Sequence, residues 1–341
     1  MRGLAVRYKY LDYAKGFAII LMLLTHTMGG ENGIKTWVSS FNMPVFFVIC
    51  GILLEEKYAG HVTAHQVAAL VRRRMVQIGV PYLVFGSALA LFYSLLNVIA
   101  GQPVTMLRRM WELLTLQGID SLWFLPCYVL AEFLSAAVRM RDSRAMQFGR
   151  KLLLAAAVVL LCLLAGNMPT DWRLRVLLKS LTGWVFVEVG ISLTRHHIMK
   201  IIPIWGAIAL LAIGAVLSEY NGFCAIGSLQ FQNPVLFFAN AAMTSTGILV
   251  LCKYAETART EHLKWLELYG RNTIVVVCTN NLLIEIIRLI DYKLFGDVLL
   301  RSGLMGCVVF TAILLVIEYI LIRMAQGSLG VLFGKVSLKR K

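Results

Sequence analysis

Charged residues are scarce in this sequence. Only 15% of the 341 residues are Asp, Glu, Lys or Arg, whereas 59% are hydrophobic. A typical soluble domain has about 25% charged residues, so too few charges remain to cover a water-facing surface. The composition argues against a soluble enzyme, a disordered chain or a secreted disulfide scaffold. It is typical of a polytopic membrane protein whose helices each need about 20 residues to span the bilayer.

Several signatures of chemistry are also missing. The sequence has no glycine-rich phosphate loop, no G-x-S-x-G motif and no C-x-x-C pair among its seven cysteines. His61 and His65 are spaced as two metal ligands on one helix face can be, but no third ligand accompanies them. We therefore expect neither a metal site nor a disulfide framework.

Ten low-charge stretches are candidates for membrane spans. They cover residues 16–28, 36–54, 75–100, 121–138, 152–168, 176–194, 201–218, 234–252, 272–287 and 302–322. No internal repeat or linker separates them. The pattern predicts one all-α membrane domain over residues 1–341, with about ten transmembrane helices.

The basic residues predict the orientation of these spans. The net charge is +15, and 23 of the 33 Lys and Arg residues fall in the termini and the even-numbered loops, against nine in the odd-numbered loops. Basic residues gather on the cytoplasmic side of a membrane, where anionic lipids attract them. The bias predicts that both termini are cytoplasmic. It also explains the high net charge, so we expect membrane lipids and no nucleic acid as partners.

The first predicted span carries ionisable residues on one face. Asp12, Lys15 and His26 recur at helical spacing, and His26 alone of the six histidines falls within a predicted span. The eleven residues from Lys15 to His26 correspond to about 16 Å along a helix. Such side chains are costly inside a membrane, so this face is a candidate functional site. The alternative is a core histidine that bonds to a neighbouring helix.

A second polar face lies in the ninth predicted span. Asn281, Glu285 and Arg288 follow the i, i+4, i+7 rule at the depth of His26. They form either a network around a substrate or a simple ion pair at the membrane edge.

The densest basic cluster is Arg72–Arg73–Arg74, just before the third predicted span. Guanidinium groups bind phosphates in bidentate geometry, so one interpretation is a site for a phosphate-bearing cytosolic cosubstrate. The other is a cluster that fixes topology and contacts lipid head groups.

Five segments, taken together and in order, resemble motifs of membrane acyltransferase family 3. They are YLDYAKGFAIILMLLTH (10–26), FNMPVFFVICG (41–51), RRRMVQIGVPY (72–82), LWFLP (122–126) and YGRNTI (269–274). The sequence departs from the family pattern at three positions. Lys15 replaces an arginine and so lacks its planar fork, Cys50 replaces a serine, and Gln77 stands where a second arginine is usual.

The resemblance implies a ten-span helical core in the bacterial cytoplasmic membrane. It further implies transfer of an acyl group, usually acetyl, from cytosolic acyl-CoA to a hydroxyl of a glycan or lipid-linked sugar at the outer face. From the resemblance and the two polar faces together, the expected site residues are His26, Lys15 and Asp12 for catalysis, Arg72, Arg73 and Arg74 for the CoA phosphates, and Trp123, Asn281 and Glu285 for the acceptor.

Acyl transfer to a hydroxyl needs a base and a group that stabilises the oxyanion. His26 could activate the hydroxyl directly or carry the acyl group itself, and Asn281 is a candidate oxyanion donor. Two other classes of function stay open. One is a transporter or flippase without acyl chemistry, and the other is a non-catalytic subunit of a glycan-synthesis complex.

Overall fold

The computed structural model describes residues 7–58, 62–140, 144–164, 167–258, 261–298 and 303–335. Within these ranges the chain is helical, apart from loops and one isolated bridge between Ala225 and Gln230. The predicted all-α class is confirmed. The elements are α1 (Lys9–Thr27), α2 (Gly33–Tyr58), α3 (Ala64–Arg74), η1 (Met75–Gly79), α4 (Val80–Ile99), α5 (Met106–Leu114), η2 (Asp120–Trp123), α6 (Phe124–Val138), α7 (Arg144–Leu164), α8 (Trp172–Arg195), α9 (Ile198–Ile201), α10 (Ile204–Asn221), α11 (Pro234–Thr257), η3 (Glu261–Leu263), α12 (Lys264–Arg271), α13 (Thr273–Ile290), η4 (Asp291–Phe295), α15 (Gly303–Gln326) and η5 (Ser328–Phe333).

Eight helical stretches of the described chain are long and apolar enough to cross a membrane. They are Gly33–Tyr58, Ala64–Ile99, Asp120–Val138, Trp172–Arg195, Ile204–Asn221, Pro234–Thr257, Thr273–Phe295 and Gly303–Gln326. These correspond to eight of the ten predicted spans. The predicted spans 16–28 and 152–168 lie in α1 and α7, which are not among the eight.

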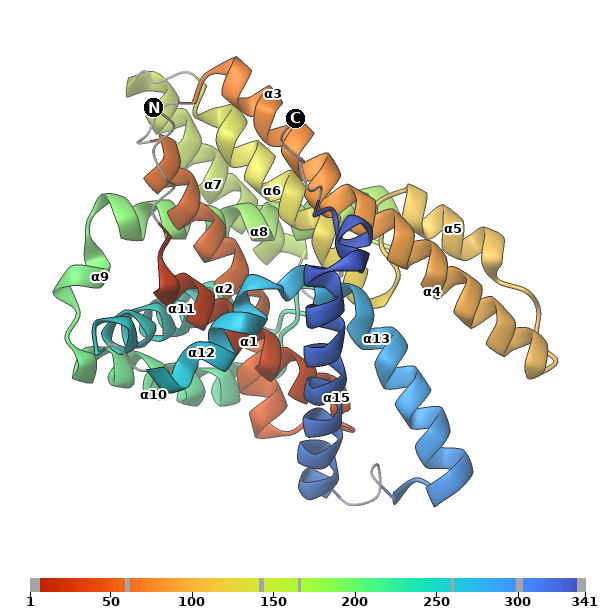
Figure 1. Ribbon diagram of the computed structural model, residues 1–341. Helices are drawn as coiled ribbons and strands as arrows, with labels where there is room; N and C mark the ends of the chain where they lie inside the picture. Colours follow the sequence, from red (N-terminus) through yellow and green to blue (C-terminus); the bar gives the residue numbers. More distant parts are fainter. Residues whose placement is uncertain are drawn as a thin grey trace, which may run out of the picture.

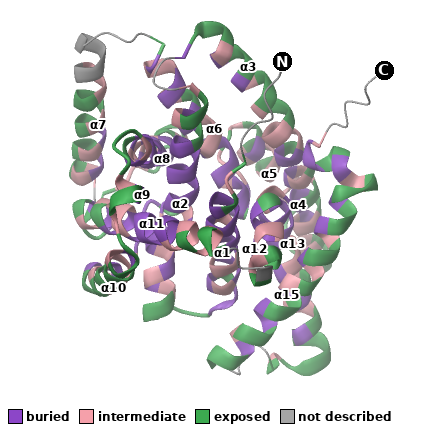
Figure 2. Ribbon diagram, turned by 60° about the vertical axis from the view of Figure 1, so that its left-hand side comes forward, coloured by how far each residue is buried: buried purple, intermediate pink, exposed green. Residues whose placement is uncertain are grey.

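The centre of the bundle is formed by α1, α2, α8 and α11, where buried residues are concentrated (Figure 2). Helix α2 packs against α8, and α1 packs against α2, α11 and α12. Two pairs of helices, α4 with α5 and α13 with α15, diverge from this centre as arms (Figure 1). Large apolar side chains such as Leu95, Val216 and Val316 are exposed on the outer helices, as lipid-facing residues are. The protein is a multi-pass membrane protein.

Two glycines bring α1 and α12 into backbone contact. A Cβ atom on Gly16 would lie 2.1 Å from the carbonyl oxygen of Leu266, and one on Gly270 would lie 1.7 Å from that of Asp12. Only glycine permits helices to approach this closely. The contact fixes the start of α1 beside Arg271, the last residue of α12.

The third span is longer than predicted. The prediction starts it at residue 75, after the three arginines, whereas α3, η1 and α4 form one continuous helix over Ala64–Ile99. The five residues of η1 form a π-helical turn inside it. The arginine cluster therefore lies on a helix and not in a loop.

Candidate functional site

His26 lies in the last turn of α1 and lines a cavity of about 320 Å³, which we call the His26 cavity. Its imidazole is exposed to this space, and none of the described side chains hydrogen-bonds to it. Polar and aromatic side chains share the lining: Lys35, Ser39, Asn42, Ser121, Trp123 and Arg288. The cavity therefore presents an imidazole without a side-chain hydrogen-bond partner, and hydrogen-bond donors lie in the same lining.

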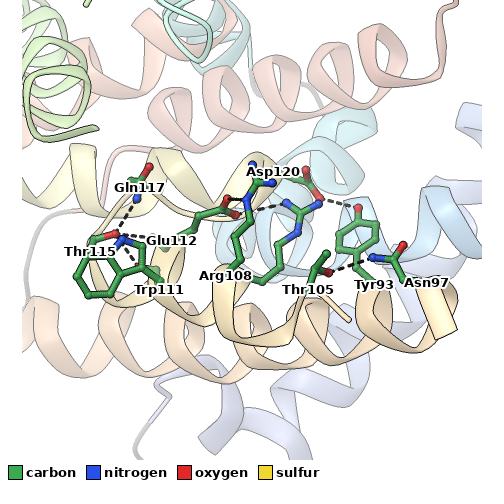
Figure 3. Close-up of polar contacts among 10 residues, drawn as sticks. Tyr93, Asn97, Thr105, Arg108, Trp111, Glu112, Thr115, Gln117 and Asp120 are labelled. Carbon is green, nitrogen blue, oxygen red and sulfur yellow. Dashed lines mark hydrogen bonds and ion pairs between the residues drawn. The ribbon is translucent and has the colours of Figure 1, made fainter. Parts of the chain in front are cut away.

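Trp123 in the wall of the His26 cavity contacts two neighbouring segments, and the short helix that it ends is bonded to α4. It ends η2, whose first residue, Asp120, accepts a hydrogen bond of 2.6 Å from the hydroxyl of Tyr93 on α4 (Figure 3). The ammonium of Lys179 lies 5.0 Å from the centre of the Trp123 ring. Behind the ring, a Cβ on Gly227 would lie 2.9 Å from its Nε1, so the loop before α11 packs directly on it.

Of the three residues on the polar face of the ninth predicted span, one lines the His26 cavity. Arg288 lines the His26 cavity, donates a 3.1 Å hydrogen bond to the carbonyl oxygen of His26 and pairs with Glu285 at 3.3 Å. Asn281 and Glu285 do not belong to the lining. The buried Asn280 lies behind the lining, where its Oδ1 accepts a 2.9 Å hydrogen bond from the lining residue Ser121.

A second cavity, of about 430 Å³, opens around the other end of α1, and we call it the Lys15 cavity. Four basic side chains line it: Lys15, Arg74, Arg271 and Lys335. Two further cavities of about 500 and 450 Å³ adjoin it, since the first shares Lys15 and Arg271 with it and the second shares Arg74.

Asp12 lies with Lys15, apart from His26. Its buried carboxylate pairs with the Lys15 ammonium at 2.7 Å and accepts a 2.9 Å hydrogen bond from Nε of Arg7. Asp12 and Lys15 line the adjoining 500 Å³ cavity, whereas His26 lines the cavity at the far end of α1. The three residues of the predicted catalytic face are therefore divided between the two ends of the helix.

The three arginines of the basic cluster have three different environments. Arg74 forms a bidentate ion pair with the buried Glu132 on α6, at 2.6 and 2.7 Å. Arg73 is exposed and donates to Gln77 at 3.1 Å, lining the 450 Å³ cavity beside Arg74. Arg72 is exposed and outside these cavities.

The His26 and Lys15 cavities meet at a thin partition. Phe124 and Val277 line both of them. The Phe124 ring packs between the rings of Phe46, Phe47 and Tyr128, with centroid distances of 5.4–5.7 Å.

The lining residues that the sequence prediction missed include Asn42, Phe124, Arg271 and Lys335. The first three lie inside the segments 41–51, 122–126 and 269–274, so the motif resemblance could have found them. Lys335 lies in no such segment. No group of three or more metal-ligating side chains occurs among the described residues, and His61 of the predicted histidine pair lies outside them.

This arrangement defines a class: a helical membrane protein with a basic cavity at one end, a histidine-bearing cavity at the other, and a partition between them. The acyltransferase domain of acyltransferase family 3 matches residues 8–323, and the chain belongs to that family. The family predicted from the five segments is therefore confirmed. No curated protein and no solved structure matches the chain significantly.

Proposed function

We propose that the protein transfers an acyl group, normally acetyl, from acyl-CoA to a hydroxyl of a glycan or lipid-linked sugar. The observation that carries the proposal is the pair of cavities on either side of Phe124 and Val277. A basic cavity suits the phosphates of a CoA donor. The His26 cavity offers the base that an acceptor hydroxyl needs.

In the proposed reaction, the pantetheine arm brings the thioester past the partition to His26. The acceptor hydroxyl passes its proton to the imidazole, and its oxygen attacks the thioester carbonyl. The carbon–sulfur bond then breaks, and the CoA thiolate takes up the proton from the imidazolium. Asn42 and Arg288 line the same cavity, and their N–H groups can donate to the oxyanion.

The proposed orientation places the Lys15 cavity in the cytoplasm, where acyl-CoA is made, and the His26 cavity toward the outer face. Ten spans, with α1 and α7 added to the eight apolar stretches, would put both termini on the cytoplasmic side of a bacterial inner membrane. The ends of the described chain lie toward the same end of the bundle (Figure 1), which supports an even number of crossings. The excess of Lys and Arg in the termini and even-numbered loops supports the direction.

Release of free CoA from acetyl-CoA by the purified, detergent-solubilised protein tests this function. We expect release that depends on an added membrane glycan extract, with the acetyl group recovered on the glycan. A folded protein that releases no CoA across several acyl donors and extracts would contradict the proposal. Substrate flux in vesicles without acyl consumption would then identify a transporter.

The size of the Phe124 side chain should limit the acyl group that can pass between the cavities. We expect Phe124→Leu to raise the ratio of butyryl to acetyl transfer by on the order of tenfold, because methylene groups that no longer clash gain free energy in an apolar passage. The measurement is kcat/KM for both donors. Phe186→Leu is the matched control, since Phe186 is also buried and lines neither cavity. Equal ratios in both variants would show that Phe124 does not separate the cavities.

A further inference from the structure

The chain beyond α15 turns back onto the bundle. We call residues 328–335, which comprise η5, Gly334 and Lys335, the C-terminal strap. The family match ends at residue 323, so the strap lies outside the matched domain. Even so, Phe333, Gly334 and Lys335 line the Lys15 cavity. A wall of this cavity is therefore made by residues that the family domain does not include.

The C-terminal strap is seated on the π-helical turn η1. Phe333 is buried and stacks on Phe85 of α4 with the ring centroids 4.7 Å apart. Gly334 has a φ of +66°, and a Cβ there would lie 2.4 Å from the carbonyl oxygen of Val76. This close contact and left-handed backbone both favour glycine. They direct the next residue, Lys335, into the cavity.

The four cations of the Lys15 cavity differ in how far they are neutralised. Lys15 pairs with Asp12 at 2.7 Å, and Arg74 pairs with Glu132 through two hydrogen bonds. No acidic side chain belongs to the lining of this cavity among the described residues. The carboxylates instead lie behind Lys15 and Arg74.

Arg271 and Lys335 keep most of their positive charge available. Arg271 is half exposed, and its nearest carboxylate, that of Glu267, is 3.7 Å away. Lys335 donates a 2.8 Å hydrogen bond to the amide oxygen of Asn272, which carries no charge. Burial lowers the pKa of the Lys335 ammonium below its ordinary value, and the positive charge of Arg271 lowers it further. Two cations that repel each other across a cavity favour an anion between them.

We propose that Lys335 and Arg271 bind a phosphate group of the acyl donor, so that the C-terminal strap forms part of the donor site. This inference rests on the proposed function, because it assumes a phosphate-bearing donor in the Lys15 cavity. It assigns the phosphate contact to two residues outside the arginine cluster. The role of Arg74 is then to stabilise the cavity wall through its ion pair with Glu132.

The test compares donors that carry phosphates with one that does not. In the full-length protein we expect Lys335→Gln to weaken binding of free CoA and to raise KM for acetyl-CoA by about tenfold, the size expected when one charge-assisted hydrogen bond is lost. We expect kcat to be unchanged. KM for acetyl-pantetheine, which has no phosphate, should not change either. Lys335→Arg should keep CoA affinity within about threefold of the original, because it retains the charge.

Arg323→Gln is the matched control. Arg323 lies in the last turn of α15, donates to the Tyr319 hydroxyl and lines neither cavity, so its loss should leave CoA binding unchanged. An equal rise in KM for acetyl-pantetheine in Lys335→Gln would overturn the inference, because it would show that Lys335 only holds the strap in place. Unchanged CoA affinity in Lys335→Gln would also overturn it, with the proposed function intact. If the unmodified protein binds no CoA, the proposed donor fails and the inference fails with it.

Discussion

His26→Ala is expected to reduce the rate of acyl transfer by about 10²–10⁴-fold, the usual contribution of a positioned base. His26 is the titratable base of the His26 cavity, and its imidazole has no hydrogen-bond partner among the described side chains. CoA affinity should be unaffected, because the basic cavity lies about three helical turns away around Lys15. The measurements are kcat from CoA release and Kd for CoA by calorimetry.

His65→Ala is the control for this variant. His65 is exposed near the start of α3 and lines none of the cavities. The acyl-transfer rate of His65→Ala should therefore equal that of the unmodified protein. A decrease in kcat of less than tenfold for folded His26→Ala would remove His26 from the reaction. In that case a non-catalytic role of the histidine, bonded within the helix bundle, would be the better description.

The fold class follows from composition, but the paths of single helices do not. A low charge fraction and ten apolar stretches predict an all-helical membrane protein, since no other spanning structure satisfies the backbone in such a chain. The sequence prediction starts the third span at residue 75 because three consecutive arginines have the composition of a loop, whereas the helix over Ala64–Ile99 includes them. Arg74 is accommodated in the helix because it pairs with Glu132 on α6, and Arg72 and Arg73 are exposed. The two residues are 58 positions apart, and a contact at that separation produces no pattern in the local sequence.

The candidate site was predictable where one helix determines it. Helical spacing alone places Lys15 and His26 three turns apart, and the structure adds that each end faces a separate cavity. Neighbouring helices decide the rest. In α13, the predicted Asn281 lies one position from Asn280, and that step turns the side chain by about 100° around the helix. Only the packing of η2 beside α13 selects Asn280 as the partner of Ser121.

Arg74→Gln is expected to destabilise the protein by about 3–5 kcal/mol, because it leaves the Glu132 carboxylate buried without its cation. Glu132 is only 3% exposed, and both of its oxygens accept hydrogen bonds from the Arg74 guanidinium. The midpoint of thermal unfolding should fall by about 5–10 °C in detergent. Arg73→Gln is the control, since this exposed neighbour in the same helical turn donates only to Gln77 and should leave the midpoint unchanged.

The double variant Arg74→Gln, Glu132→Gln distinguishes a structural arginine from a phosphate ligand. Two neutral amides can hydrogen-bond to each other, so most of the lost stability should return if the ion pair itself is the main role. Any CoA affinity that Arg74→Gln loses through a disturbed cavity wall should then return in the double variant. The wall is restored, and the charges of Arg271 and Lys335 are unchanged. If stability returns and CoA affinity does not, Arg74 contacts the donor directly. The basic cluster would then act on phosphate, as the sequence resemblance implies.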